Sequence, residues 1–150
     1  TNIRKNYLNQ TISEIINRKP RFICIEDLNV SGMMKNRRLS KAIQEQGFFR
    51  FRRQLEYKCS DKGIQLIVAD RFYPSSKLCS RCGKIKKNLK LSDRVYRCDC
   101  GNMIDRDFQA SINLKAYGEQ FAIWHLNVNA NMYGYVSSEF MPMESTKNCE

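Results

Sequence analysis

Four cysteines in two close pairs constrain the fold of this 150-residue chain more than any other feature. Cys79 and Cys82 form a C-x2-C pair, and Cys98 and Cys100 form a C-x-C pair after fifteen intervening residues. Each short pair supplies two thiolates from one tight turn, and four thiolates complete the tetrahedral shell that Zn2+ prefers. The spacing therefore predicts a closed, structural zinc site on these four cysteines. Four unrelated cysteines and two separate redox pairs are the alternatives.

The remaining composition indicates an intracellular protein with an acidic partner. The seven cysteines are odd in number and no signal-peptide pattern opens the chain, so we expect a reducing compartment. The net charge of +11 favours nucleic acid or an anionic membrane surface. No apolar run approaches the ~20 residues that span a bilayer, so nucleic acid is favoured over membrane. The chain begins at Thr1 rather than methionine, and we expect either a processed or shortened piece or a fragment of a longer gene product.

Hydrophobic periodicity predicts helices alternating with strands, which indicates an α/β layered domain. Both predicted strands are continuous apolar runs, as in parallel strands buried on both faces. The turn that opens at Asn29 leads into a basic loop. The predicted order is a helix over 3–17, a strand over 22–26, a helix from Leu39 to about Lys62 ended by Gly63, and a strand over 64–70.

Two groups of basic residues are candidates for nucleic-acid contact. One group lies on the long predicted helix, mostly outside its apolar stripe, and the other lies between the cysteine pairs. A charge run is also typical of a solvated surface, so this assignment depends on the overall positive charge. The candidates are Arg50, Arg52, Arg53, Lys84, Lys86 and Lys87.

An Asp-Arg-Asp triplet follows the second cysteine pair and opens a helix predicted from about Asp105 to Tyr117, with Gly118 at its end. Aspartate is a favoured N-cap, and we assign that role to Asp105. Asp107 then lies one turn before residues on the packed side, where a carboxylate is costly unless it is paired or bound to metal. A favourable interaction with the helix dipole is the alternative for Asp107.

Glu26 ends the first predicted strand, and ligands of open α/β sheets bind beyond the carboxyl ends of strands. An acid there and Asp107 on a helix that packs on the same sheet form a plausible pair of Mg2+ ligands. Two-metal phosphodiester hydrolysis uses such carboxylates. Two acids are nevertheless fewer than such sites normally gather.

Three motifs in this order carry a family resemblance: "ICIEDLNVSGM", "YPSSKLCSRCG" and "CGNMIDRDFQASINL". Together they closely resemble the C-terminal half of TnpB-type proteins (OrfB of insertion sequences), the transposon-encoded RNA-guided endonucleases related to type V CRISPR effectors. The match covers about residues 5–118.

The resemblance implies an α/β fold: a partial RNase H-like (RuvC-like) domain with an inserted four-cysteine zinc ribbon. It places Glu26 and Asp107 at the family's second and third catalytic acids. Gln109 replaces an asparagine usual in "DRDxN", and the first catalytic aspartate, in a "GIDLG"-like context, is missing from these 150 residues. The implied divisions are 1–70 in the nuclease domain, 71–104 as the ribbon, 105–118 as the last nuclease helix and 119–150 as a tail of uncertain structure.

The resemblance further implies a Mg2+-dependent DNA endonuclease with structural Zn2+. Its partners would be DNA, a guide RNA and a transposase encoded by the same element, in the cytoplasm of a prokaryotic cell at the nucleoid. Because the first aspartate is missing, we expect the chain alone to be inactive. The alternative is a non-catalytic zinc-ribbon protein that only binds nucleic acid; a ribosomal-type ribbon is less favoured, since it needs no pair of acids.

Overall fold

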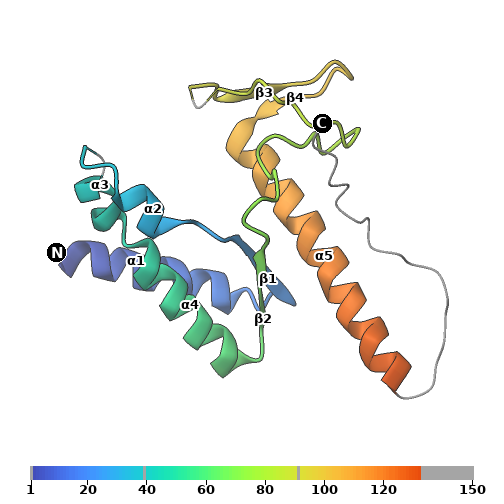
Figure 1. The fold of residues 1–150 in the computed structure, drawn as a ribbon. Helices are drawn as coiled ribbons and strands as arrows, with labels where there is room; N and C mark the ends of the chain where they lie inside the picture. The colour runs from blue at the N-terminus through green and yellow to red at the C-terminus, as the bar shows by residue number, and fades with distance from the viewer. Residues whose placement is uncertain (1, 39, 91, 133–150) are drawn as a thin grey trace.

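The computed structural model describes residues 2–38, 40–90 and 92–132, and of residues 123–132 it describes the helical backbone only. Helices lie on both sides of a small parallel sheet, and the cysteine segment lies at the first turns of the last helix (Figure 1). The elements are α1 (Asn2–Asn17), β1 (Phe22–Glu26), α2 (Val30–Met34), α3 (Ser40–Gln46), α4 (Phe48–Lys62), β2 (Gln65–Ala69), β3 (Val95–Arg97), β4 (Met103–Asp105) and α5 (Arg106–Met132).

Strands β1 and β2 pair in parallel, in a register that sets Phe22 beside Gln65 and Glu26 beside Ala69. This confirms the predicted parallel pair, and it brings the carboxyl ends of both strands to one edge. The expectation that both strands are buried on both faces is wrong for β1. Among the described residues β1 is half-buried along its length, and its last residue is exposed.

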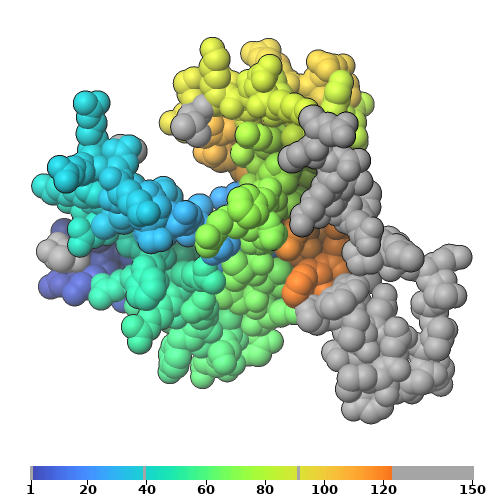
Figure 2. Space-filling view, viewed as in Figure 1, coloured from blue at the N-terminus to red at the C-terminus, as the bar shows by residue number. Residues whose placement is uncertain are grey.

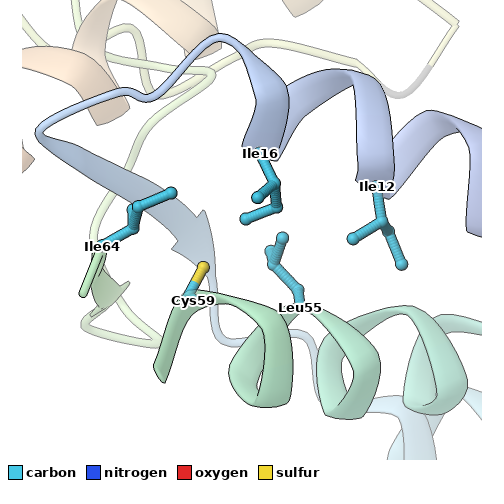
Figure 3. Close-up of a cluster of buried hydrophobic side chains, with 5 residues drawn as sticks. All are labelled: Ile12, Ile16, Leu55, Cys59 and Ile64. Carbon is cyan, nitrogen blue, oxygen red and sulfur yellow. The ribbon is translucent and has the colours of Figure 1, made fainter. Parts of the chain in front are cut away.

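Side chains alternate between the two faces of the sheet because successive strand residues point in opposite directions. Ile23, Ile25 and Leu66 pack into the core that α1 and α4 build on one face. Phe22 and Cys24 lie on the other face, against α5. The buried centre of the α1–α4 core consists of Ile12, Ile16, Leu55, Cys59 and Ile64 (Figure 3).

The predicted long helix from Leu39 to Lys62 is divided in two, which corrects the sequence prediction. Gly47 separates α3 from α4 and has a left-handed backbone with φ of 71°. Glycine adopts this conformation readily, whereas a side chain there is strained. The apolar stripe continues across the break, so periodicity alone did not reveal it. The segment predicted as a turn and basic loop also contains one short helix, α2, capped by the Asn29 side chain, which accepts from the backbone N–H of Gly32.

Helix α5 does not end at Gly118, so the predicted boundary is wrong. It continues to Met132, and Gly118 serves close packing instead. A Cβ at this position would lie 3.0 Å from Cys24 Cβ and closer still to the Phe22 ring. The absence of a side chain therefore lets α5 approach β1. Residues 119–132 of the expected tail belong to this helix, and residues 133–150 lie outside the described residues.

Candidate metal-binding sites

The four predicted zinc ligands converge on one point at the tip of the cysteine segment. Their sulfur atoms all lie within 4.8 Å of one another. The Sγ atoms of Cys79 and Cys100 are 3.6 Å apart, as are those of Cys82 and Cys98. Disulfide sulfurs lie about 2.05 Å apart, whereas tetrahedral Zn–S bonds of about 2.3 Å place sulfurs about 3.8 Å apart. The spacing fits four ligands around a metal and not two disulfides.

The surroundings of the thiols also favour a cation. Burial raises the pKa of Cys79, but the backbone amides of Cys82 and Arg81 and the side-chain amide of Asn102 donate to its sulfur and lower the pKa to about 6. The backbone amide of Lys84 lowers the pKa of Cys82, yet the three neighbouring sulfurs raise it to about 12. Negative charge on one sulfur therefore disfavours deprotonation of its neighbours, and a bound cation would relieve the repulsion between the thiolates.

A buried amide side chain joins the cysteine segment to α5. Gln109 is fully buried, and its Oε1 accepts from Ser80 Oγ at 3.1 Å and from Asn102 Nδ2 at 3.2 Å. Gln109 Nε2 donates to the backbone carbonyl of Leu78 at 2.6 Å. The glutamine that departs from the family's usual asparagine thus fixes the first cysteine turn to the helix.

Glu26 lies at the carboxyl end of β1, on the face that carries Phe22 and Cys24, because strand residues two apart share a face. This is the face covered by α5. The hydroxyl of Ser75, in the loop after β2, donates to Glu26 Oε1. Glu26 as a residue is exposed, so a ligand can reach it from solvent.

The Asp-Arg-Asp triplet divides into two roles. Asp105 Oδ1 accepts from the backbone N–H groups of Asp107 and Phe108, both at 2.9 Å, which confirms the predicted N-cap. The Asp107 side chain is 75% exposed and lies 3.6 Å from Arg106 Nε. The expectation that Asp107 faces packed residues is therefore wrong at its own turn of the helix.

Helical spacing relates Asp107 to the sheet. Ser111, Leu114 and Gly118 follow it along one line of α5, at intervals of four, three and four residues. Ser111 and Leu114 line a cavity of about 440 Å³ with Phe22, and Gly118 packs on the same ring. Asp107 thus continues the helix face that covers β1. Within the described ranges, Glu26 and Asp107 belong to no group of three or more close metal-ligand side chains, and the four cysteines form the only such group.

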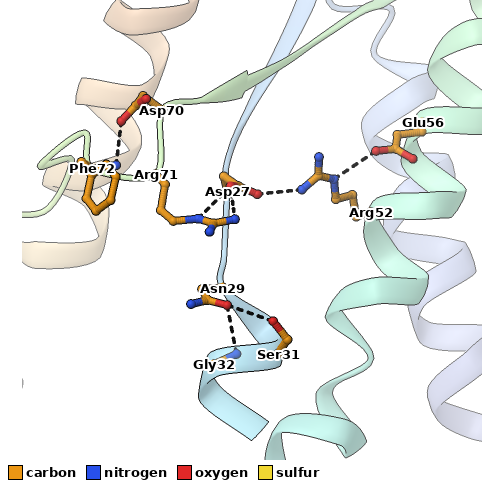
Figure 4. Close-up of polar contacts among 9 residues, drawn as sticks. All are labelled: Asp27, Asn29, Ser31, Gly32, Arg52, Glu56, Asp70, Arg71 and Phe72. Carbon is orange, nitrogen blue, oxygen red and sulfur yellow. Dashed lines mark hydrogen bonds and ion pairs between the residues drawn. The ribbon is translucent and has the colours of Figure 1, made fainter. Parts of the chain in front are cut away.

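A cluster of charges that the sequence analysis missed lies at the carboxyl end of β1, directly after Glu26. Asp27 accepts from Arg52 Nη1 at 2.9 Å and from Arg71 Nη2 at 2.7 Å, and Arg52 also pairs with Glu56 at 3.0 Å (Figure 4). Hydrogen bonds from Arg71 and then Arg52 lower the pKa of Asp27. The available signal was an acid directly after each strand, Asp27 after β1 and Asp70 after β2. Its two arginine partners, from α4 and from the loop after β2, were not visible in the sequence.

The structure separates the six basic candidates. Arg50 and Arg53 are exposed on α4, with no partner among the described side chains, whereas Arg52 is held by Asp27 and Glu56. Between the cysteine pairs, Lys84 pairs with Asp99 at 3.0 Å, Lys86 donates to the carbonyl of Arg97 at 3.0 Å, and Lys87 is exposed.

The surface between the α2–α3 region and the cysteine segment is hollowed. Figure 2 shows the α2–α3 region, in blue and cyan, and the cysteine segment, in yellow, standing on either side of a recess. Beside the α2–α3 region, a cavity of about 750 Å³ is lined by residues that include Glu26, Asp27, Arg52 and Arg71.

No helix in the described part of the chain is long and apolar enough to cross a membrane.

Comparisons with known proteins find a matching family model and several similar proteins. The family model described as Cas12f1-like, TNB domain matches residues 48–114. A protein of Streptomyces pristinaespiralis whose name describes an RNA-guided DNA endonuclease is 40% identical over 118 residues, which cover 79% of this chain and 29% of that protein. TnpB-like protein L79 of Acanthamoeba polyphaga mimivirus is 32% identical over 125 residues, which cover 79% of this chain and 23% of that protein.

The fold has a solved counterpart. The cryo-EM structure of the Cas12f1–sgRNA–target DNA complex matches with a TM-score of 0.55 at 18% sequence identity, covering 75% of this chain and 32% of that one. The arrangement of helices and strands described here therefore also occurs in a solved structure. The chain spans less than a third of the length of these curated relatives, at 29% and 23%.

Proposed function

Because the chain is a TnpB-type protein, we propose that it is the C-terminal portion of a transposon-associated RNA-guided DNA endonuclease. The observation that carries the proposal is that two acids lie toward the same side of the sheet. Glu26 ends β1 on the face covered by α5, and Asp107 stands on the first turn of α5 along the line that packs on that face. Both are the acids that the family resemblance assigns to catalysis.

In this proposal residues 1–70 and helix α5 belong to a RuvC-like nuclease domain of RNase H fold, and residues 71–104 form a zinc ribbon inserted between them. Two parallel strands with helices on both faces support the first assignment. The antiparallel β3–β4 pair beside the four-cysteine cluster supports the second. Cys79, Cys82, Cys98 and Cys100 would hold Zn2+, which would stabilise the ribbon without taking part in the reaction.

Glu26 and Asp107 would hold Mg2+ through their carboxylate oxygens, which are the ligands this cation prefers. When bound, the cation would supply an activated water and charge stabilisation at the scissile phosphate. The chain's own residues would position that chemistry. The hydroxyl of Ser75 donates to Glu26, and the Asp105 cap fixes the helix turn that presents Asp107.

Guide RNA and target DNA are the proposed partners, as in the Cas12f1–sgRNA–target DNA complex. The net charge of +11 supports this partner class, and Arg50, Arg53 and Lys87 offer exposed charge for phosphate contact. A transposase partner and association with the nucleoid remain predictions.

A non-catalytic nucleic-acid-binding protein is the second candidate. It is favoured by one observation: among the described residues, Glu26 and Asp107 are joined by no further acid into a cluster.

Cleavage by the full-length protein separates the two candidates. The wild-type protein, loaded with its guide RNA, should cut a matched target only when Mg2+ is present. Glu26→Gln keeps the shape of the side chain and removes its charge, so cutting should be lost while target binding persists. Full cutting by Glu26→Gln would contradict the catalytic role, and binding without cutting by the wild type would favour the second candidate.

A further inference from the structure

Ser75 is a buried polar residue that belongs neither to the cysteine cluster nor to the pair of acids. It is 5% exposed, in the loop that leads from β2 to the first cysteine pair. Its hydroxyl donates to Glu26 Oε1. One oxygen of the proposed metal-binding carboxylate thus has a partner from the protein, and the other oxygen remains for a cation.

The main chain of Ser75 is itself held by α5. Asn113, which is 3% exposed, donates its Nδ2 hydrogens to the carbonyl of Ser75 at 2.6 Å and to the carbonyl of Leu78 at 2.8 Å. The hydroxyl of Tyr73 in turn donates to the carbonyl of Asn113 at 3.2 Å. These bonds fasten the loop on both sides of Ser75, so the position of its hydroxyl follows that of the helix.

The contact between Ser75 and Glu26 does little for stability. Glu26 is exposed, so water can replace the serine hydroxyl as a donor at small cost. Orientation is different, because an exposed glutamate with several rotatable bonds samples many positions, whereas a buried donor selects one of them. When a partner that orients a metal-binding carboxylate is mutated, metal affinity or activity typically falls by about 10–100-fold.

We propose that Ser75 is a positioning residue for Glu26, held in place by Asn113, and that it presents the free carboxylate oxygen to the divalent cation. The inference rests on the proposed function. It assigns Ser75 no contact with the substrate. It also connects the two halves of the site, since α5 carries both Asp107, in its first turn, and Asn113, which holds Ser75.

The test uses the full-length protein with guide RNA and target DNA. We compare wild type with Ser75→Ala, which removes the hydroxyl, and Ser75→Thr, which keeps one. The matched control is Ser80→Ala, because the Ser80 hydroxyl donates to Gln109 and not to Glu26. Three quantities are measured: the melting temperature, the Mg2+ concentration that gives half-maximal single-turnover cleavage, and the binding of Mn2+ followed by the EPR signal of the free ion.

Ser75→Ala should raise the required Mg2+ concentration and weaken Mn2+ binding, each by about 10-fold or more, at an unchanged melting temperature. Ser75→Thr and Ser80→Ala should stay close to wild type. If Ser75→Thr does not fit the buried site and melts early, the comparison of Ser75→Ala with Ser80→Ala decides. Wild-type metal dependence in Ser75→Ala, with Glu26→Gln inactive, would overturn this inference and leave the proposed function standing. Full cutting by Glu26→Gln would instead overturn the proposed function.

Discussion

Asp105 caps the helix on which Asp107 stands: Asp105 Oδ1 accepts from the backbone N–H of Asp107 at 2.9 Å. Two aspartates two positions apart therefore have separate roles, because one carboxylate is used by the helix and the other is 75% exposed. A substitution at each position tests a different property of the protein.

Asp105→Ala should lower the free energy of unfolding by about 1 kcal/mol, since it leaves two N–H groups without their cap. Asp107→Asn should leave stability nearly unchanged and abolish Mg2+-dependent cleavage in the full-length protein. Thermal melts and cleavage assays on both variants make the comparison. Equal loss of cleavage and of stability at both positions would mean that Asp107 acts only on the helix.

Metal removal should act on the cysteine segment first. Protein purified without chelator should contain one Zn2+ per chain, and Cys79→Ser should lower this content and the melting temperature together, because a closed thiolate site supplies folding energy. Cys59→Ser is a useful control, since Cys59 lies in the α1–α4 core and should change stability but not zinc content. A metal-free protein whose cysteine segment remains ordered would contradict the zinc assignment.

The features that local sequence determines were predictable. Two continuous apolar runs gave the parallel strands, and the Asp105 cap followed from a residue preference at helix starts. The paired cysteines identified the sulfur cluster because their spacing fixes the geometry of a turn. In each case the pattern that allowed the prediction, an apolar run, a cap residue or a cysteine pair, lies within a few consecutive residues.

Features that depend on distant contacts were not predictable in the same way. Glycine is common at helix ends, so Gly118 suggested one. The residue is instead a glycine because the Phe22 ring, far away in sequence, occupies the space that a side chain would need. Gly47 interrupts a stripe whose apolar spacing continues undisturbed. Asp27 gains its two arginine partners from α4 and from the loop after β2, so a single acid after a strand was uninformative.

The ion pairs of Asp27 should make stability depend on pH. Hydrogen bonds from Arg71 and Arg52 lower its folded pKa below the unfolded value of about 3.9. The stabilisation is therefore fully present above the unfolded pKa and is lost as pH falls through the folded pKa. Asp27→Asn should melt earlier than wild type at neutral pH, and the difference should shrink below about pH 4. Asp61→Asn is the control, because Asp61 pairs only with its neighbour Lys62 on the exposed end of α4. A difference that grows in acid would have the wrong sign.

Nucleic-acid affinity should depend on where the positive charge lies. Arg50→Glu with Arg53→Glu should weaken binding at every sequence tested and make the dependence on salt less steep, since fewer phosphate counterions are released. Lys5→Glu with Lys41→Glu makes the same change in net charge at exposed positions on α1 and α3 and is the matched control. Equal weakening by both pairs would indicate a general effect of charge. Arg52→Glu should act mainly on stability, because its guanidinium is held by Asp27 and Glu56.

The 150-residue chain by itself should not cleave DNA, even with Mg2+ or Mn2+. Glu26 and Asp107 supply two carboxylates, and the carboxylate of Asp27, directly after Glu26, is already paired with Arg52 and Arg71. A metal site short of carboxylates holds its ions poorly, and misplacement by about 1 Å can cost ~100-fold in rate. The measurement is nicking of a supercoiled plasmid by the purified chain over a range of Mn2+ concentrations, with the full-length protein and its guide RNA as the positive control. Metal-dependent nicking by the chain that disappears in Glu26→Gln would show that the site is completed by acids within these 150 residues.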